Sequence, residues 1–190
     1  MIIDRQDPHF NSMQNAKRRM FALRNGIIAD VLRRAGDPHR IIFGLNLPQL
    51  AEIASLTGPD AGLAEALFAN DSTRESRLLA PMLMPAESFS HDDAIRWATA
   101  LLGTEEADIL CHRLLRHCDF APQLGAELLV SDTPLVQYCG LRLLFNLLNM
   151  RRLTPERIME ITAGRTFAPP ADTLGVQLAD ECRFLSDSAL

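Results

Sequence analysis

The chain has 190 residues, of which 47% are hydrophobic, and a formal net charge of -5. This length fits one domain, or one continuous array of small repeats, with a sizeable buried core. No apolar run reaches the roughly 18 residues that a membrane-spanning helix needs. The first ten residues carry an acid at Asp4 and no long apolar stretch, which argues against a secretory signal. The sequence therefore predicts a cytoplasmic protein with no membrane partner.

Charge is distributed unevenly along the chain. Residues 1–40 carry eight basic and four acidic side chains, whereas residues 41–109 carry three and eleven. Residues 110–152 are again basic, with five against three, and 18 of the 19 basic residues in the whole chain are arginine. Arginine binds phosphate with a planar fork of donors, so a phosphate-binding surface is one explanation, and a G+C-rich genome is the other. Basic residues can therefore share a face although the whole chain is acidic.

Apolar residues recur at spacings of three and four through the whole length, and alternating β-branched runs are absent, so no strand is predicted. Breaks fall every 10 to 20 residues, as at Asn25-Gly26, Gly58-Pro59 and Gly164 to Pro170. This pattern predicts an all-α fold: a single domain over residues 1–190, built as a HEAT-like α-solenoid of antiparallel helix pairs. A compact helical bundle is the competing architecture. The predicted helices span residues 12–35, 47–57, 60–69, 74–83, 91–103, 104–118, 121–130, 134–150, 156–165 and 172–185.

Two capping signals precede charged helices. Ser72 to Glu75 reads as a capping box, in which a hydroxyl accepts from the backbone of Glu75 and the Glu75 side chain reaches back. Thr104 is placed to cap the central helix, TEEADILCHRLLRHC. Trp97, the only tryptophan, falls on the apolar stripe of the preceding helix and is predicted to be a core residue.

The central segment holds the residues that could carry chemistry. Cys111 and Cys118 share one face of a continuous helix, while His112 and His117 point to opposite sides of it, so the four cannot meet one tetrahedral metal ion. All four cysteines of the chain lie in apolar periodic segments, which predicts free, buried thiols. We expect no metal and no cofactor. Asp108, beside the apolar stripe, is the one candidate for a catalytic carboxylate, and a solvated or arginine-paired aspartate is the alternative.

Four arginine side chains lie on the polar faces of predicted helices. In a solenoid, equivalent helices line up, so these side chains could share one concave surface that binds double-stranded DNA. The predicted DNA-binding residues are Arg77, Arg113, Arg116 and Arg142.

Short pieces in a fixed order resemble the DNA alkylation repair enzyme family. They are Phe43-Gly44-Leu45, Leu47 to Leu50 and Glu75 to Ala80, followed by the Trp97 helix and the central segment. The resemblance covers about residues 15 to 150 and implies an all-α, HEAT-like solenoid. It also implies a monofunctional DNA glycosylase that excises alkylated purines without a metal.

The family's Trp-Asp-x-x-Asp signature on the central helix is not matched. In the register compared, Ala107 stands at the tryptophan, Asp108 at the first aspartate and Cys111 at the second. A family arginine that contacts the DNA backbone would fall near Gln137 or Tyr138. A neutral thiol cannot stabilise an oxocarbenium-like cation as a carboxylate does. The sequence thus indicates a DNA-binding protein of this fold without the standard glycosylase site. Two alternatives stay open: an active glycosylase with a rearranged site that uses Asp108, and a helical scaffold that binds another protein.

Overall fold

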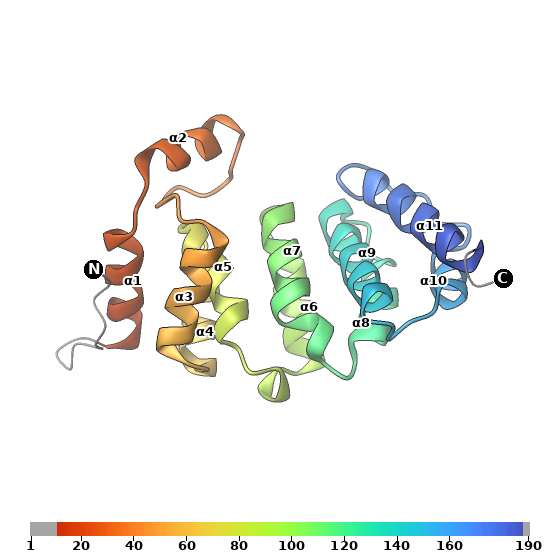
Figure 1. Cartoon of the computed structure of the whole chain (residues 1–190), viewed down its shortest axis with the longest axis horizontal. Helices are drawn as coiled ribbons and strands as arrows, with labels where there is room; N and C mark the ends of the chain where they lie inside the picture. The colour runs from red at the N-terminus through yellow and green to blue at the C-terminus, as the bar shows by residue number, and fades with distance from the viewer. Residues whose placement is uncertain (1–10, 188–190) are drawn as a thin grey trace. The chain divides into compact units, whose positions relative to one another are not determined.

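The computed structural model describes residues 11–187, and all regular structure in that part of the chain is helical (Figure 1). The only β-type pairing there is an isolated bridge between Ile41 and Thr73. The all-α prediction is confirmed. Residues 1–10, on which the expectation of no secretory signal rests, lie outside the described residues. The helices are α1 Ser12–Ala22, α2 Gly26–Arg34, α3 Leu47–Thr57, α4 Ala61–Phe68, α5 Arg74–Leu83, α6 His91–Thr99, α7 Thr104–Arg113, α8 Ala121–Leu128, α9 Pro134–Asn149, α10 Pro155–Thr162 and α11 Ala171–Asp187, with short 3-10 turns η1 Ala86–Ser88 and η2 Leu115–His117.

Backbone contacts divide the chain into two compact units, with the boundary between Ser88 and Phe89. The sequence predicts one domain over residues 1–190, whereas each of the two units has internal contacts of its own. Within residues 11–187, every helix is too short or too polar to cross a lipid bilayer.

The first unit is built around the antiparallel pair α4 and α5. Asp60 N–H donates to the Leu83 carbonyl at 2.9 Å, while Arg77 at the other end of α5 donates to the Phe68 carbonyl at 2.7 Å. Helices α1 and α3 pack against this pair, and the core between them is fully buried. Its largest side chains include Met20, Leu45, Leu50, Ile53, Leu67, Leu78, Leu79 and Leu83.

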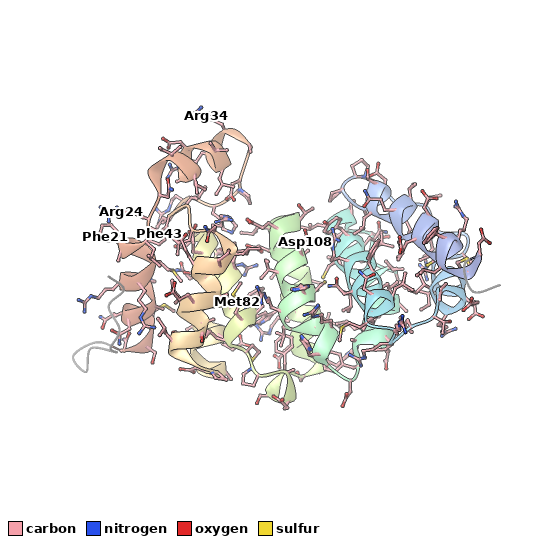
Figure 2. All side chains as sticks on the ribbon, viewed as in Figure 1. Phe21, Arg24, Arg34, Phe43, Met82 and Asp108 are labelled. Atoms are coloured by element: carbon pink, nitrogen blue, oxygen red, sulfur yellow. The ribbon has the colours of Figure 1, made fainter. Side chains whose placement is uncertain are left out.

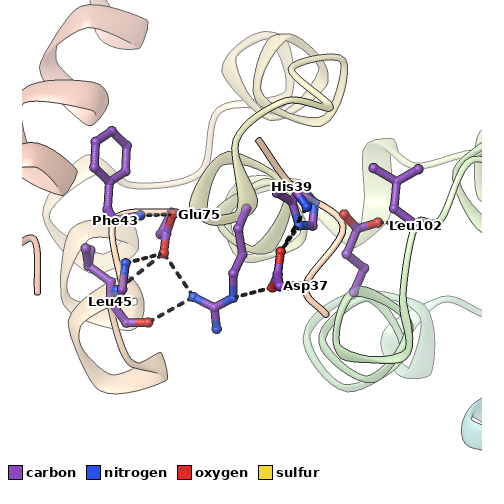
Figure 3. A network of polar contacts seen from close by, with 9 residues as sticks. Asp37, His39, Phe43, Leu45, Glu75 and Leu102 are labelled. Atoms are coloured by element: carbon purple, nitrogen blue, oxygen red, sulfur yellow. Dashed lines mark hydrogen bonds and ion pairs between the residues drawn. The ribbon is translucent and has the colours of Figure 1, made fainter. Parts of the chain in front are cut away.

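A buried carboxylate holds the segment between α2 and α3 onto this unit. Glu75 is 0% exposed and accepts N–H bonds from Phe43 at 3.0 Å, Gly44 at 2.9 Å and Leu45 at 3.3 Å (Figure 3). The Arg74 guanidinium lies 2.9 Å from the same carboxylate. A charge can be buried in this way because donors satisfy it on several sides. Glycine is required at position 44, since its φ is +78° and a Cβ there would collide with backbone atoms of the α2 segment.

The predicted capping box at Ser72 to Glu75 is wrong for this reason. The N-cap of α5 is Thr73, and its side chain makes no capping hydrogen bond. The Glu75 side chain turns away from its own helix end because three backbone donors of the 43–45 segment are better partners. The sequence signal detected the start of the helix but not the distant partner of the carboxylate.

The second unit contains a tightly crossed antiparallel pair, α8 and α9. A Cβ added at Gly125 would lie 2.8 Å from Leu144 Cδ2, and one added at Gly140 would lie 3.0 Å from the Gly125 carbonyl oxygen. The two glycines therefore let the backbones of α8 and α9 approach more closely than larger residues would allow. Helix α11 packs on α9 as well, with α10 beside it.

Helix α7 runs parallel to α9 in the same unit. Residue numbers increase in the same direction along the two contacting segments. Asp108 bonds to Tyr138, Cys111 to Cys139, and the backbone of Arg116 to Arg152. Ala107, Cys111 and Cys139 are fully buried between the helices. Figure 1 shows α7 and α9 side by side. Trp97 of α6 is 0% exposed and belongs to the core of the same unit.

We expect Glu75→Gln to destabilise the first unit strongly. The amide keeps an acceptor oxygen but loses the charge that Arg74 and the three N–H donors stabilise, and breaking a buried pair costs about 3 kcal/mol or more. Urea unfolding followed by circular dichroism measures this change. Glu52→Gln, at an exposed position of α3, is the matched control and should stay within about 0.5 kcal/mol of wild type. Equal, small effects of both substitutions would contradict a supporting role for Glu75.

Candidate functional site

A polar cluster lies where α7 passes α9, and it consists of Asp108, Tyr138 and Arg142. Asp108 Oδ1 accepts from the Tyr138 hydroxyl at 2.9 Å and from Arg142 Nε at 2.7 Å. Arg142 Nη2 also donates to the Tyr138 oxygen at 3.0 Å, which closes a triangle of hydrogen bonds. Asp108 is labelled on α7 in Figure 2. The sequence prediction of an arginine-paired aspartate is therefore realised, with a tyrosine as a third member.

The two donors leave half of the Asp108 carboxylate open. Both bonds go to Oδ1, and no residue in the described part of the chain donates to Oδ2. The Asp108 side chain is 41% exposed, and that of Arg142 is 28% exposed. The carboxylate is thus held in one orientation by protein donors on Oδ1, while the side chain as a whole stays partly exposed. Such an arrangement can stabilise a positive charge brought to it.

The cluster also shifts the pKa values of two of its members. Burial raises the pKa of Tyr138, and Asp108 raises it further while Arg142 opposes both. Burial alone would lower the pKa of Arg142, but the bond to Tyr138 and the charge of Asp108 raise it overall. Tyr138 therefore stays a neutral donor and Arg142 stays charged at physiological pH.

Two thiols lie beneath this cluster. Cys111 Sγ is 3.3 Å from the Cys139 carbonyl oxygen and 3.5 Å from Cys139 Sγ, and both residues are 0% exposed. Burial, reinforced by Cys139 and by Asp108, holds the pKa of the Cys111 thiol well above its usual range. Cys111 is therefore a neutral packing residue, in agreement with the predicted free, buried thiols.

A second group of side chains, called here the basic cluster, lies at the C-terminal ends of the same helices. Arg152, just after α9, donates to the carbonyl oxygens of Arg116 and, at 3.1 Å, Cys118, which ties the two chain segments together. Asp119 is the only acid within residues 112–120 and 149–153. The members of the basic cluster are His112, Arg113, Arg116, His117, Arg151 and Arg152.

Arg116 is the centre of the basic cluster. Its Nε donates to His117 Nε2 at 3.1 Å, and its Nη1 lies 3.1 Å from His112 Nδ1. Partial burial lowers the pKa of both histidines, followed by the charge of Arg116 on each. Arg113 lowers the pKa of His112 further, and Arg152 lowers that of His117. Both imidazoles are therefore neutral near pH 7 and free to accept from Arg116.

The four predicted DNA-binding arginines lie in four different environments. Arg142 joins the polar cluster and Arg116 joins the basic cluster. Arg113 is exposed on α7, about 140° around the helix from Asp108 when each residue turns about 100°. Arg77 requires a correction: the sequence predicts it on the polar side of its helix, lining a concave DNA-binding surface. It is 4% exposed, with its guanidinium 3.6 Å from the Phe68 ring centroid. The carbonyl of Phe68 and this ring draw Arg77 into the α4–α5 contact, so it does not face solvent.

The central helix is also shorter than predicted. Helix α7 ends at Arg113, and the chain continues as the 3-10 turn η2 rather than as one helix to Cys118. Gly103, not Thr104, is the N-cap residue, and the Glu106 side chain accepts from the Leu102 N–H at 3.0 Å near this end. The turn after Arg113 brings His112 and His117 to the same guanidinium, whereas a continuous helix would hold them apart. Among the described residues, no group of three or more histidine, cysteine or acidic side chains is placed to hold a metal ion.

Sequence reasoning missed Tyr138 and Arg152 as site residues. Tyr138 and Arg142 are four residues apart on α9, so helical spacing does place them on one face. Nothing in the sequence shows that this face meets Asp108, because the contact joins residues about 30 apart. Arg152 belongs to no motif, and its role depends on where α9 ends.

Fold and site together define an all-helical protein with an oriented carboxylate and a basic cluster along two parallel helices. Comparison with protein families, with characterised proteins and with solved structures finds no match to this chain. The resemblance to the DNA alkylation repair enzymes therefore stays a prediction from the sequence.

Because the four thiols are buried, we expect their chemical modification to be slow. We expect all four cysteines to react with a thiol reagent such as Ellman's reagent only after unfolding, because each is buried and burial raises the pKa of Cys111 and of Cys182. Stopped-flow absorbance with and without urea measures the number of reactive thiols. Rapid reaction of Cys111 in the native protein would contradict its role as a neutral packing residue.

Proposed function

We propose that this chain is a DNA-binding helical-repeat protein of the alkylation-repair type, and that its second unit binds duplex DNA through the basic cluster. The observation that carries the proposal is the convergence of three arginines and two histidines at the ends of α7 and α9, with Arg151 next to them in the chain and Asp119 as the only acid in those segments. Phosphate groups supply the negative charge that this surface lacks.

The chemistry of the side chains supports a phosphate-bearing partner. Arg113 and Arg151 are exposed, and Arg113 has no acidic partner among the described residues. A guanidinium group binds a phosphate through two parallel N–H···O hydrogen bonds. Several such contacts give affinity without a catalytic step. The formal net charge of -5 is consistent with this proposal because the acids gather in other segments of the chain.

The helix arrangement supports the repeat part of the proposal. Helices α8 and α9 form an antiparallel pair, and α7 runs parallel to α9. A stack of helix pairs requires both relations, since partners within a pair oppose each other while equivalent helices of successive pairs point the same way. We propose that the second unit is a HEAT-like stack in which α7 and α9 are equivalent inner helices.

Replacing Arg113 and Arg116 with alanine should weaken duplex binding at low salt. Each lost phosphate contact reduces the slope of log affinity against log salt concentration by about 1. Fluorescence anisotropy with a labelled mixed-sequence duplex, repeated over a salt series, measures this slope. Arg157→Ala is the control, because Arg157 is also exposed but lies on α10 and pairs with Glu160. If wild type fails to bind a duplex at low salt, the proposed function is refuted.

A second function, glycosylase chemistry at Asp108, is favoured by one specific observation. Asp108 is fixed by Tyr138 and Arg142 through Oδ1, which leaves Oδ2 open to a cation. In such a rearranged site Asp108 supplies the carboxylate that stabilises a sugar cation, in place of the second aspartate that Cys111 replaces.

This second function predicts that the protein releases alkylated purines from methylated duplex DNA and that Asp108→Asn slows the release by about a hundredfold or more. The amide keeps the hydrogen-bonding shape but removes the charge. Chromatography of released bases measures the rate, with Asp132→Asn, an exposed aspartate between α8 and α9, as the control. No release by wild type would leave DNA binding as the function, and release unaffected by Asp108→Asn would remove the role of Asp108.

A further inference from the structure

Arg116 is held by neutral imidazoles in place of a carboxylate. His117 Nε2 and His112 Nδ1 each lie 3.1 Å from a nitrogen of its guanidinium. An imidazole can accept from a guanidinium only through an unprotonated ring nitrogen. The two contacts therefore exist only while both histidines are neutral, and each would become repulsive on protonation.

We propose that Arg116, His112 and His117 form a phosphate-binding site in which protonation of the two imidazoles releases the Arg116 guanidinium to the anion. This inference rests on the proposed function and deepens it. The ligand class is a phosphate group, carried by a nucleic-acid backbone or by a free polyphosphate. The protons come from solvent, and the bound anion balances the added charge.

The charged groups around the two histidines oppose their protonation until an anion binds. The charged groups closest to them are basic: Arg113 and Arg116 beside His112, and Arg116 and Arg152 beside His117. Two acids lie near in sequence. Asp108, one turn before His112, already binds Arg142, and Asp119 is exposed two residues after His117.

No acid from the neighbouring helices offsets this charge. The one charged residue of α8, Glu127, lies 2.9 Å from His91 of α6. On α9 the charged residue is Arg142, and Arg151 and Arg152 follow its end. An external anion is therefore the group that can stabilise two imidazolium ions beside Arg116.

Affinity for the anion should depend on pH in a defined direction. In the free protein the pKa of each histidine is lowered, and a bound phosphate raises it. Binding then takes up protons between the free and bound pKa values. Affinity is constant above the bound pKa, rises as pH falls through it, and levels off below the free pKa. A rise of one pKa unit in one histidine corresponds to about a tenfold gain in affinity.

The direct test follows the histidine ring protons of the full chain by NMR across a pH titration, with and without inorganic pyrophosphate. We expect the pKa of His112 and of His117 to rise by about one unit with pyrophosphate, while the His91 ring-proton signals do not respond to pyrophosphate. Single His→Gln variants assign the resonances. Unchanged pKa values for His112 and His117, or an equal response of the His91 signals, would overturn the site.

A second measurement uses duplex DNA at about pH 6 and about pH 8. Wild type should bind about tenfold or more tightly at the lower pH. The double variant His112→Gln/His117→Gln should lose this gain, because glutamine can accept from Arg116 but cannot be protonated. His91→Gln is the matched control and should keep the gain. Retention of the pH effect in the double variant overturns the inference. Absence of duplex binding at both pH values refutes the proposed function, and the pyrophosphate titration then decides the site alone.

Discussion

The close, parallel contact between α7 and α9 is the constraint on which the second unit depends. Small buried residues lie between the helices, and the Cys111 sulfur reaches the Cys139 carbonyl oxygen at 3.3 Å. At this separation Asp108 can bond to Tyr138 and Arg142, and the two C-terminal ends can meet through Arg152. A larger residue at Cys111 would push the helices apart and separate both polar groups at once. Packing in the core therefore sets the geometry of the exposed site.

The first unit uses a buried charge for a comparable purpose. Glu75 gathers three backbone N–H groups that would otherwise need other partners, and so fixes a segment without regular structure against α5. Arg77 is buried in the same unit by Phe68. In both cases a residue that the sequence presents as polar surface is drawn inside by an acceptor or donor on a neighbouring element. Composition gives no indication of such partners.

Much of the secondary structure was predictable because its signals are local. The break at Asn25-Gly26 is real, Asn25 and Asn46 cap α2 and α3, and Trp97 is fully buried. The errors occur where a distant residue decides the outcome. The Glu75 side chain binds backbone groups about 30 positions earlier and not its own helix end. For Asp108, the sequence allowed either a catalytic carboxylate or a solvated or arginine-paired one, and it did not identify Arg142 as the partner. The end of α7 at Arg113 was missed because the apolar spacing continues through Leu114 and Leu115.

The parallel direction of α7 and α9 has an electrostatic consequence. The peptide dipoles of a helix place a partial negative charge at its C-terminus, and here two such ends lie close to one another. The carbonyl oxygens of Arg116 and Cys118, which follow the end of α7, accept from the Arg152 guanidinium. The backbone itself thus supplies negative potential where the side chains are almost all positive. A concentration of arginines can persist there with Asp119 as the only carboxylate in these segments, and its charge stays available to a ligand.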